Sequence, residues 1–513
     1  MSGIERIDGA IGRLPLHGVV ATRALETAAL AGVPGYALMA RAGDAVARLA
    51  VALVPHCRRV VVFAGPGNNG GDGIEAATRL RRFGKRAEVV LVGNLSQAGD
   101  AVTALARARA AGVDIRSFEA EGERGDDVCD LVIDALLGIG ASRAPEGTLA
   151  VAIERIATLA ASGARVLAID LPSGLDAERG QPFGSRCVVA TDTLTMLTLK
   201  PGLFTAAGRD HAGRVWLARL GVGKGNSSAP PDAWLVGRAD PSCSASARRH
   251  AQHKGSFGDV AVVGGAAGMS GAGWLAARAA HAAGAGRVFV DSLGDDGALS
   301  AAALDPLHPE LMFRPGWWRG AEEAIADATV VCGCGGGDAV RSALPRLLSI
   351  VPRLVVDADA LNAIAIDTAL AAQTAARAAR GFATVLTPHP LEAARLLGST
   401  TGEVQGDRLR AARGLAERFR AVVVVKGSGT VLAAPAEVPR INATGNAALA
   451  SAGTGDVLAG WIGGRWASSP GASAIDIATR AVIEHGAPAE PEGAGAIRAG
   501  DLIEALYRRS RSA

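Results

Sequence analysis

The sequence is poor in aromatic residues, in cysteine and in net charge. Phe, Trp and Tyr make up 4% of the 513 residues, so the core must be built from small aliphatic side chains, which suits close packing of helices on sheets. Six cysteines scattered through a chain of this length do not form the framework of a disulfide-stabilised secreted domain. A formal net charge of +3 does not indicate a nucleic-acid-binding surface, and we expect no nucleic acid among the partners.

Long apolar runs and a secretion signal are also lacking. No stretch of about 20 residues is both apolar and free of charge, so we expect no membrane span. The segment Met1–Asp8 has no basic region followed by an apolar one, so we expect no signal peptide and a cytoplasmic location. Cys332 and Cys334 lie close together without His or Cys neighbours, which favours buried small residues over a metal site.

Short runs rich in Val, Ile and Leu alternate with helical patterns in both halves of the chain. In the first half, strands are predicted at Arg58–Phe63, Ala87–Val92, Leu131–Leu136, Val166–Ile169 and Thr193–Leu199, with helices between them. The alternation restarts after Ser256, and the Gly-, Ser- and Pro-rich stretch 221–231 between the halves predicts a linker. The sequence therefore predicts two α/β domains with parallel sheets, covering residues 1–224 and 225–513.

A glycine- and asparagine-rich segment follows the first of these strands and opens a helix. The segment Gly65–Gly73 reads GPGNNGGDG. Glycines let the backbone approach a ligand closely, and the free amides at a helix start suit a phosphate. Asparagine side chains also offer oxygen ligands to a hard cation. A plain strand-to-helix turn would not need this combination, so the segment predicts a ligand site.

Polar residues follow two further strands of the first half. Asp134 ends one strand, and Asp170 and Ser173 follow the next. Ligands of open parallel sheets bind at the carboxyl ends of the strands, so these side chains and Asn69 are expected to converge on one crevice. One aspartate alone could simply cap the next helix. Three strand ends together favour a functional site.

The turn Gly453-Thr454-Gly455-Asp456 precedes a predicted helix near the C-terminal end of the chain. The amides of such a turn can stabilise the charge on a transferring phosphoryl group. Asp456 is placed to accept a proton from an attacking hydroxyl group. An ordinary N-capping aspartate is the alternative, but it would not need the Gly- and Asn-containing stretch before the turn. The turn predicts phosphoryl transfer to a hydroxyl group.

Three other strand ends of the second half carry groups that suit a nucleotide. The segment Lys426–Thr430 follows four valines and is typical of a phosphate-binding loop, although Lys426 could be a solvated charge. His389 lies between two prolines that fix its backbone, although a lone histidine is more often structural. Asp357 and Asp359 follow another strand and either meet a metal–nucleotide complex or cap a helix.

The motifs of the first half resemble the epimerase domain of the NAD(P)H-hydrate repair family, over roughly residues 1–220. The resemblance implies a Rossmann-like three-layer domain with a parallel sheet. It implies substrate contacts from Asn68, Asn69, Gly70, Gly71, Asp72, Gly138, Ile139, Gly140, Ala141, Ser142, Arg143, Ala144 and Asp170. It also implies a K⁺ ion held by Asn69, Asp134 and Ser173. Asp170 is the candidate catalytic acid or base.

The motifs from about His253 to Trp466 resemble the dehydratase domain of the same family, a branch of the ribokinase-like kinases. The resemblance implies a ribokinase-like α/β fold with Asp456 as catalytic base and Mg²⁺ bound with the nucleotide. It implies substrate contacts from Ala272, Gly335, His389 and Asp456, and adenine-nucleotide contacts from Lys426, Gly427, Ser428, Gly429, Thr430 and Gly455. The family usually has proline at the position of Cys334, a departure that removes no group with evident chemistry.

Together the two resemblances imply a bifunctional enzyme that repairs the hydrated nicotinamide nucleotides NADHX and NADPHX. The first domain would interconvert their R and S epimers. The second would phosphorylate the S hydroxyl from ADP and then eliminate phosphate, giving NAD(P)H, AMP and phosphate. We also expect a homo-oligomer.

Two alternatives fit part of the pattern. The phosphoryl-transfer turn suits a ribokinase-like small-molecule kinase equally well, fused to a nucleotide-binding module, although the first domain argues against it. A non-catalytic scaffold is the other alternative. It predicts a degraded Asn68–Asp72 segment and a strongly basic chain, and the sequence has neither.

Overall fold

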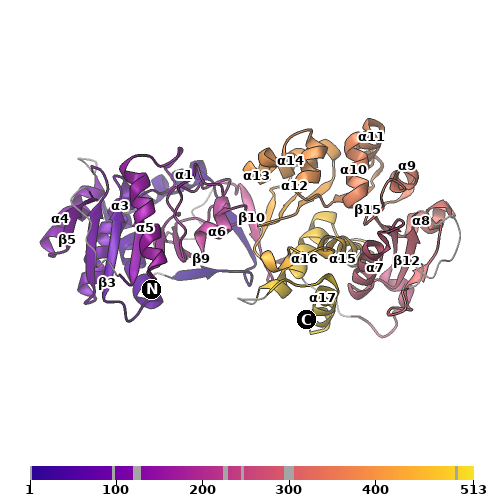
Figure 1. Cartoon of the computed structure of the whole chain (residues 1–513), viewed down its shortest axis with the longest axis horizontal. Coiled ribbons are helices and arrows are strands. Elements are labelled where there is room, and N and C mark those ends of the chain that lie inside the picture. Colours follow the sequence, from indigo (N-terminus) through magenta and orange to yellow (C-terminus); the bar gives the residue numbers. More distant parts are fainter. Residues whose placement is uncertain are drawn as a thin grey trace. The chain divides into compact units, whose positions relative to one another are not determined.

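The computed structural model of the chain describes residues 3–94, 99–118, 129–222, 229–243, 248–293, 305–490 and 495–512. The chain divides into two compact units (Figure 1). The first comprises Met1–Asp8 and Pro15–Ala233, and the second comprises Gly9–Leu14 and Trp234–Ala513. The predicted boundary between residues 224 and 225 lies outside the described residues.

The first unit is built on an eight-stranded sheet in the order β1-β9-β8-β7-β6-β3-β4-β5. Its strands are β1 (Ile4–Ile7), β3 (Arg59–Ala64), β4 (Arg86–Leu91), β5 (Asp114–Ser117), β6 (Leu131–Ala135), β7 (Arg165–Ile169), β8 (Asp192–Met196) and β9 (Arg214–Ala218). The edge strand β1 runs antiparallel to β9, and the other neighbours are parallel. The helices are α1 (Val19–Ala31), α2 (Ala37–Leu53), α3 (Asn68–Arg82), α4 (Asp100–Ala110), α5 (Thr148–Ala161) and α6 (Gly208–Ala212).

Alternating side chains of β3 explain why this unit has three layers. Val60 and Val62 lie in a core cluster with residues of α2, α3 and α4. Val61 and Phe63, which point to the opposite face, lie in a second cluster with residues of α5. Because both faces of the strand are buried, its sequence is a continuous apolar run, as expected for a central parallel strand.

The second unit is built on an eleven-stranded sheet in the order β13-β12-β11-β14-β15-β16-β17-β18-β19-β10-β2. Its strands are β2 (Arg13–Leu16), β10 (Ala233–Val236), β11 (Asp259–Gly264), β12 (Arg287–Ser292), β13 (Met312–Phe313), β14 (Thr329–Cys332), β15 (Arg353–Val356), β16 (Ala383–Leu386), β17 (Val422–Val425), β18 (Val431–Ala433) and β19 (Arg440–Asn442). The run from β13 to β17 is parallel, whereas β17, β18 and β19 form antiparallel pairs.

Helices cover this sheet in two groups, visible above and below it in Figure 1. One group is α7 (Ser270–Ala282), α15 (Thr454–Ser468), α16 (Ala474–Gly486) and α17 (Ala499–Ser512), whose apolar residues share a core cluster with Val260, Val262 and Val331 of the sheet. The other group is α9 (Val340–Ile350), α10 (Ala358–Ile366), α11 (Thr368–Ala376), α12 (Pro390–Leu397), α13 (Thr401–Gly406) and α14 (Arg408–Phe419), with the short α8 (Glu322–Asp327) beside them. Small residues allow the close approach of α7 and α15, where the added Cβ of any residue at Gly460 would clash with the backbone of Ala276.

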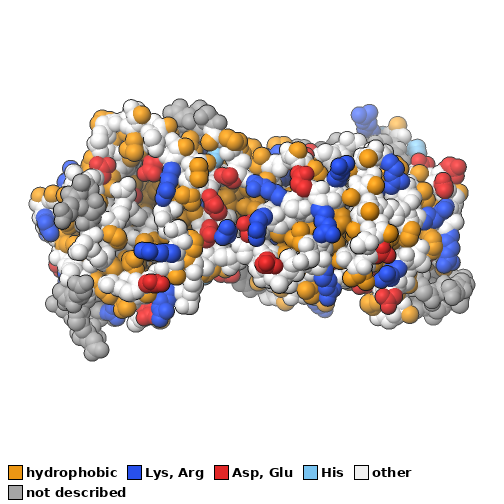
Figure 2. All heavy atoms as spheres, turned by 90° about the horizontal axis from the view of Figure 1, so that it is seen from above, with side chains coloured by type: hydrophobic (Ala, Val, Ile, Leu, Met, Phe, Trp, Pro, Cys, Tyr) orange, Lys and Arg blue, Asp and Glu red, His pale blue; other side chains and the backbone are white. Residues whose placement is uncertain are grey.

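The predicted strands of the first unit are present, with ends that differ by a few residues. Helix α3 begins at Asn68, so most of the Asn- and Gly-rich segment lies within the helix itself. Lys, Arg, Asp and Glu side chains are interspersed over the face shown in Figure 2. Within the described part of the chain, no helix is both long enough and apolar enough to cross a membrane.

Candidate active sites

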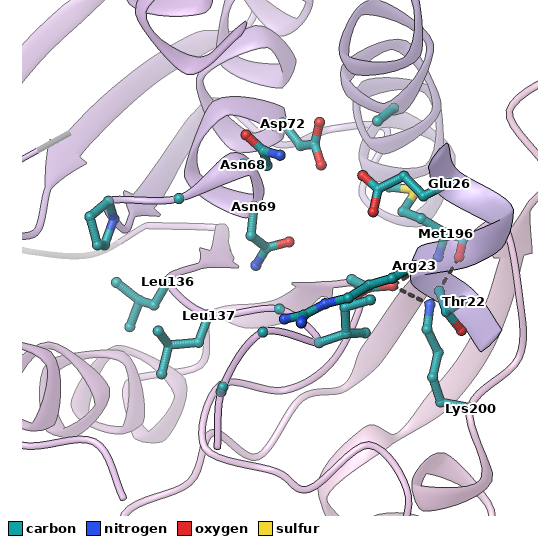
Figure 3. A pocket seen from close by; sticks show the side chains of 18 of the residues that line it. Thr22, Arg23, Glu26, Asn68, Asn69, Asp72, Leu136, Leu137, Met196 and Lys200 are labelled. Atoms are coloured by element: carbon teal, nitrogen blue, oxygen red, sulfur yellow. Dashed lines mark hydrogen bonds and ion pairs between the residues drawn. The ribbon is translucent and has the colours of Figure 1, made fainter. Parts of the chain in front are cut away.

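A pocket of about 850 Å³ lies in the first unit at the carboxyl ends of β3, β6 and β7. Figure 3 shows Asn68, Asn69 and Asp72 of α3 on one side of it and Arg23 and Glu26 of α1 on the other. The pocket is lined by most of the residues predicted to contact substrate, namely Asn68, Asn69, Asp72, Gly138, Ile139, Gly140, Ala141, Ser142, Arg143, Ala144 and Asp170. The structure therefore brings three separate sequence motifs into one cavity.

The first turn of α3 needs its glycines because the backbone of the preceding loop lies against it. An added Cβ at Gly70 would clash with the carbonyl oxygen of Gly65, and one at Gly71 would lie 2.5 Å from the terminal methyl carbon of Met39. These two residues, which were predicted to contact substrate, pack behind the turn and do not line the pocket. They allow Asn68 and Asp72 to face the cavity. Burial, reinforced by the charges of Asp170 and Glu26, raises the pKa of Asp72 well above its ordinary value.

Asp170 and Lys200 form a buried ion pair at the floor of the pocket. The Lys200 ammonium group lies 2.5 Å from Asp170 Oδ1, and it also donates to Thr195 Oγ1 and the Met196 carbonyl oxygen at 2.9 Å each. The Lys200 side chain is 1% exposed and that of Asp170 is 12% exposed. Asp170 has a left-handed backbone, with φ of 67°, which is strained for a residue other than glycine. All described hydrogen bonds to its side chain end on Oδ1, which leaves Oδ2 for a ligand in the pocket.

Asp134 lies beneath the pocket and is fully buried. Its carboxylate accepts from Ser173 Oγ at 2.6 Å and from the amides of Ser173 at 2.8 Å and Leu136 at 3.2 Å. Burial raises the pKa of this group to about 6, although these hydrogen bonds favour its charged form. Asn69 lies nearby, within 3.5 Å of the Cβ that any larger residue would place at Gly138, and its Nδ2 is buried without a partner among the described residues.

Sequence analysis did not single out Arg23, Glu26 or Lys200 for this site. Lys200 follows the end of β8 by four residues, and the burial of a lysine cannot be read from one sequence. Arg23 and Glu26 lie on α1, three residues apart and therefore on one helix face, but this spacing also occurs on exposed helices. Burial and the charge of Asp170 raise the pKa of Glu26, which places it electrostatically within the site.

The second candidate site lies in the second unit, where β14, β15, β16 and β17 end and α7 and α15 begin. Asp456, in the first turn of α15, lies beside Asp357, which follows β15, and Cys334, which follows β14. One ligand atom of each of these three residues lies within 4.8 Å of the other two. Burial first, and then the charge of Asp357, raise the pKa of Asp456 to about 6, while a hydrogen bond with the Cys334 thiol opposes that shift.

Lys426 joins this cluster from the end of β17. Its ammonium group donates to Asp357 Oδ1 at 2.7 Å, and Thr387 Oγ1 donates to the same oxygen at 2.8 Å. The ammonium nitrogen lies 3.4 Å from the position that a Cβ at Gly455 would take, so it lies over the first turn of α15. Burial opposes the charge of Lys426, yet Asp357 and Glu392 hold its pKa above the ordinary value. Lys426 and Gly455, both predicted to contact the nucleotide, therefore lie close to each other.

His389 forms the N-cap of α12 and is only partly available for a ligand. Its Nδ1 accepts from the amides of Leu391 at 3.1 Å and Glu392 at 3.4 Å, and its Nε2 lies 3.3 Å from Glu392 Oε1. His389 therefore has the structural role that the sequence left open. Its side chain is also 46% exposed near the cluster, so part of the ring is accessible to a ligand. Burial raises the pKa of Glu392 to about 7, and sequence analysis did not identify this group.

Gly335 and Ala272 meet at the edge of the same region. Gly335 has a φ of 58°, and an added Cβ would lie 2.8 Å from that of Ala272 and 2.7 Å from the Met269 carbonyl oxygen.

The predicted nucleotide loop forms the turn between β17 and β18, and it consists of Gly427, Ser428, Gly429 and Thr430. Gly427 and Gly429 have positive φ values. The loop's own geometry is held by Arg408, which donates to the carbonyl oxygens of Val425 and Lys426 at 3.0 and 3.2 Å.

Hydrogen bonds within the fold hold the Gly453–Asp456 turn in place. Gly453 is the N-cap residue of α15 with a φ of 88°, and Thr454 Oγ1 donates to the carbonyl oxygens of Leu449 and Ser451 at 2.9 Å each. His485 Nε2 lies 2.9 Å from the Thr454 carbonyl oxygen, and burial lowers the pKa of this histidine to about 4, so the ring is neutral and donates. Asp456 does not serve as the N-cap, which removes the structural alternative for this residue.

The fold and the two clusters of polar residues indicate an α/β enzyme with one candidate ligand site in each unit. The family model described as YjeF-related protein N-terminus matches residues 35–202, and the model described as NAD(P)H-hydrate dehydratase matches residues 260–505. The chain belongs to the family of bifunctional NAD(P)H-hydrate repair enzymes. The prediction of a bifunctional enzyme is confirmed by this assignment, and the prediction of two α/β units with largely parallel sheets is confirmed by the structure.

Curated relatives match along nearly the whole chain. The bifunctional NAD(P)H-hydrate repair enzyme Nnr of Escherichia coli (strain K12) is 35% identical over 505 residues, covering 94% of this chain and 91% of the relative. Its namesake from Moorella thermoacetica is 36% identical over 490 residues, with coverages of 88% and 87%. The crystal structure of ADP/ATP-dependent NAD(P)H-hydrate dehydratase from Bacillus subtilis, co-crystallised with ATP and Mg²⁺, matches with 25% identity and a TM-score of 0.41, covering 53% of this chain and 95% of that one.

Proposed function

We propose that this chain repairs hydrated NADH and NADPH, with epimerisation in the first unit and ADP-dependent dehydration of the S epimer in the second. The observation that carries the proposal is that relatives named bifunctional NAD(P)H-hydrate repair enzymes match across both units, and that each candidate site holds a carboxylate paired with a lysine. The products of the second reaction would be NAD(P)H, AMP and phosphate.

In the second unit, Asp456 would act as the base that accepts the proton of the substrate hydroxyl. A carboxylate with a pKa of about 6 is largely ionised at neutral pH and still basic enough to accept that proton as the bond to phosphorus forms. Lys426 and the amides of the Gly453–Gly455 turn would stabilise the negative charge on the moving phosphoryl group. Phosphate, a far better leaving group than hydroxide, would then leave the ring carbon while the neighbouring ring carbon loses a proton, so that the new double bond regenerates the dihydronicotinamide.

The residues of this cluster fit Mg²⁺ through Asp357 and Asp456, because Mg²⁺ prefers carboxylate oxygens and phosphates. The thiol of Cys334 is a soft ligand and does not suit this ion. When bound, Mg²⁺ would neutralise charge on the phosphate chain of the nucleotide. Predicted contacts to the nucleotide from Gly427, Ser428, Gly429 and Thr430, and to the substrate from Ala272, Gly335 and His389, belong to this proposal.

In the first unit, Asp170 would exchange protons with the substrate through Oδ2 while Lys200 holds Oδ1. Asn68, Asp72 and the loop 138–144 would hold the nucleotide part of the substrate in the pocket. A K⁺ ion fits Asp134, Ser173 and the side-chain oxygen of Asn69, because a buried carboxylate, a hydroxyl and an amide oxygen are the ligand types that a hard cation prefers. K⁺ would supply positive charge beneath the substrate. The cytoplasmic location and the homo-oligomer stay predictions.

An absorbance assay on the full chain tests this function. Hydrated NADH containing both epimers is incubated with ADP or with ATP, and the recovery of NADH absorbance is followed. We expect the wild type to recover NADH from both epimers, and each of two variants to be strongly impaired in one of the two steps. Asp456→Asn should lower dehydration by about 10²- to 10⁴-fold but leave epimerisation intact. Asp170→Asn should leave the R epimer behind once the S epimer is consumed.

The control variant is Asp327→Asn, which changes an exposed aspartate at the end of α8 and should recover both epimers at the wild-type rate. Failure to recover absorbance, together with stable phosphorylation of another alcohol, would favour the small-molecule kinase alternative. A wild-type epimerisation rate in Asp170→Asn would contradict the acid–base role of Asp170.

A further inference from the structure

A second large pocket of about 1130 Å³ lies in the second unit, away from the phosphoryl-transfer turn. It is formed where the C-terminal ends of α7 and α17 meet the later parts of α15 and α16, four helices that pack against one another (Figure 1). Arg465 of α15 lies on its wall, eleven residues beyond Thr454. At about 1.5 Å per residue, this is roughly 16 Å along the helix from the turn.

The pocket is lined by seven arginines and one acidic residue among the residues that the structure describes. These arginines are Arg238, Arg248, Arg465, Arg480, Arg508, Arg509 and Arg511, and the acidic residue is Glu484. Guanidinium groups present several donors in a rigid fork and bind phosphate oxygens in pairs. A concave wall with this excess of one charge favours a multivalent anion.

Some of these arginines already have partners inside the fold. Arg465 and Arg480 both bind Glu484, at 2.8 and 2.9 Å, and Arg248 donates to the Gly284 carbonyl oxygen at 3.1 Å. The end of α17 differs, because Arg509 and Arg511 are exposed and neither has a carboxylate partner among the described residues. Arg511 donates to the hydroxyl of Tyr507 at 3.2 Å, which holds its side chain beside an aromatic ring on the pocket wall.

We propose that this pocket is a second, non-catalytic site that binds a nucleotide-sized polyphosphate anion through the arginines of α17 and the walls formed by α7, α15 and α16. The volume of about 1130 Å³ is slightly larger than that of typical small-molecule sites, which is about 300–1,000 Å³, and is therefore large enough for more than an isolated phosphate. Tyr507 is 41% exposed and offers an aromatic face to a base, and Ala282, Ile483 and Leu506 supply apolar wall. The function proposed above does not use this site.

Titration calorimetry on the full chain with ATP as the probe tests this site. The double variant Arg509→Gln, Arg511→Gln removes two exposed pocket charges, and Arg341→Gln, Arg410→Gln removes the same charge from exposed positions on α9 and α14. We expect one binding event of the wild type to weaken at least about tenfold in the pocket variant and to be unchanged in the control, because hydrogen bonds to charged groups are the strong ones. Dehydratase activity should be unchanged in both.

Two further arms identify the ligand. Tripolyphosphate should compete with ATP for this event but bind more weakly, and adenosine should not compete. Equal ATP binding by the wild type and both double variants would overturn the proposal. So would a change in oligomeric mass of the pocket variant with unchanged ATP binding, because that result would make the pocket an interface between copies of the chain. Tripolyphosphate binding as tightly as ATP would overturn the assignment to a nucleotide.

Discussion

Replacing Lys200 by methionine should destabilise the first unit strongly, because Lys200 neutralises Asp170 in a buried position. The ammonium group makes hydrogen bonds to three oxygens at 2.5 to 2.9 Å, and its side chain is 1% exposed. Methionine has a similar volume, so the change removes charge and donors with little effect on packing. Breaking a buried ion pair by removing one partner costs about 3–5 kcal/mol, and we expect Lys200→Met to fall in this range.

A double-mutant cycle separates the ion pair from other effects of the substitution. Asp170→Asn leaves Lys200 without its carboxylate, whereas Lys200→Met with Asp170→Asn leaves no buried charge. We therefore expect the double variant to be more stable than the sum of the single losses predicts, by about 2–3 kcal/mol, the upper range for residues in direct contact. Lys85→Met, at a half-buried surface position of the same unit, is the control and should cost less than about 1 kcal/mol.

Denaturant titration followed by hydrogen exchange of β7 and β8 peptides measures the first unit separately from the second. Dehydration of the S epimer in the same samples shows whether the second unit remains folded. Additive losses within about 0.5 kcal/mol would refute the reasoning, because they would mean that Lys200 and Asp170 do not stabilise each other. Epimerisation should be lost in Lys200→Met even under conditions where the unit is fully folded.

Three further predictions concern pH, cations and backbone conformation. Dehydration should slow as the pH falls through about 6, because Asp456 becomes protonated there. Cys334→Ala should move this acidic limb of the pH–rate profile to higher pH, because the thiol hydrogen bond that favours the carboxylate is lost. Measuring kcat against pH checks both predictions. Native Asp134, with a pKa of about 6, holds a proton that the unfolded chain releases near 4. The free energy of unfolding of the first unit should therefore fall as the pH rises from about 4 to 6. In thermal unfolding at pH 7, K⁺ should offset this loss more than choline, the control cation, does. Gly335→Ala should cost about 1–3 kcal/mol and raise the KM for the S epimer, because its φ of 58° and the 2.7 Å approach to the Met269 carbonyl oxygen leave no room for a Cβ.

The central parallel strands were predictable because both of their faces are buried, which gives continuous apolar runs such as Val422–Val425. The edge strands were not. The short edge strands β1 and β5 each mix apolar with charged or polar residues, since they are only partly buried, and this pattern does not differ from that of a loop. Helix α17 was also missed, because charged residues dominate its C-terminal half and its apolar stripe is narrow.

The candidate sites followed from the sequence wherever a motif ends a strand. Asp134, Asp170 and Lys426 lie at the ends of β6, β7 and β17, where the topology of a parallel sheet places them, whereas Asp456 was predicted from its own turn at the start of α15. Groups contributed by a neighbouring helix were not predictable, and Glu26 on α1 is the clearest case. A side chain of this kind enters the pocket through tertiary packing, which leaves no spacing or turn signal in the chain.

The early segment Gly9–Leu14 belongs to the second unit, although the chain then continues into the first unit. It carries Arg13, whose guanidinium binds Asp240 at 2.9 and 3.0 Å, and it begins β2, the edge strand beside β10. A gene truncated to encode only residue 234 onward would therefore lack this strand and uncover the backbone of β10, a surface prone to aggregation. We therefore expect that separating the two activities for biotechnological use needs a circularly permuted gene or a grafted copy of this strand in addition to a cut between the units.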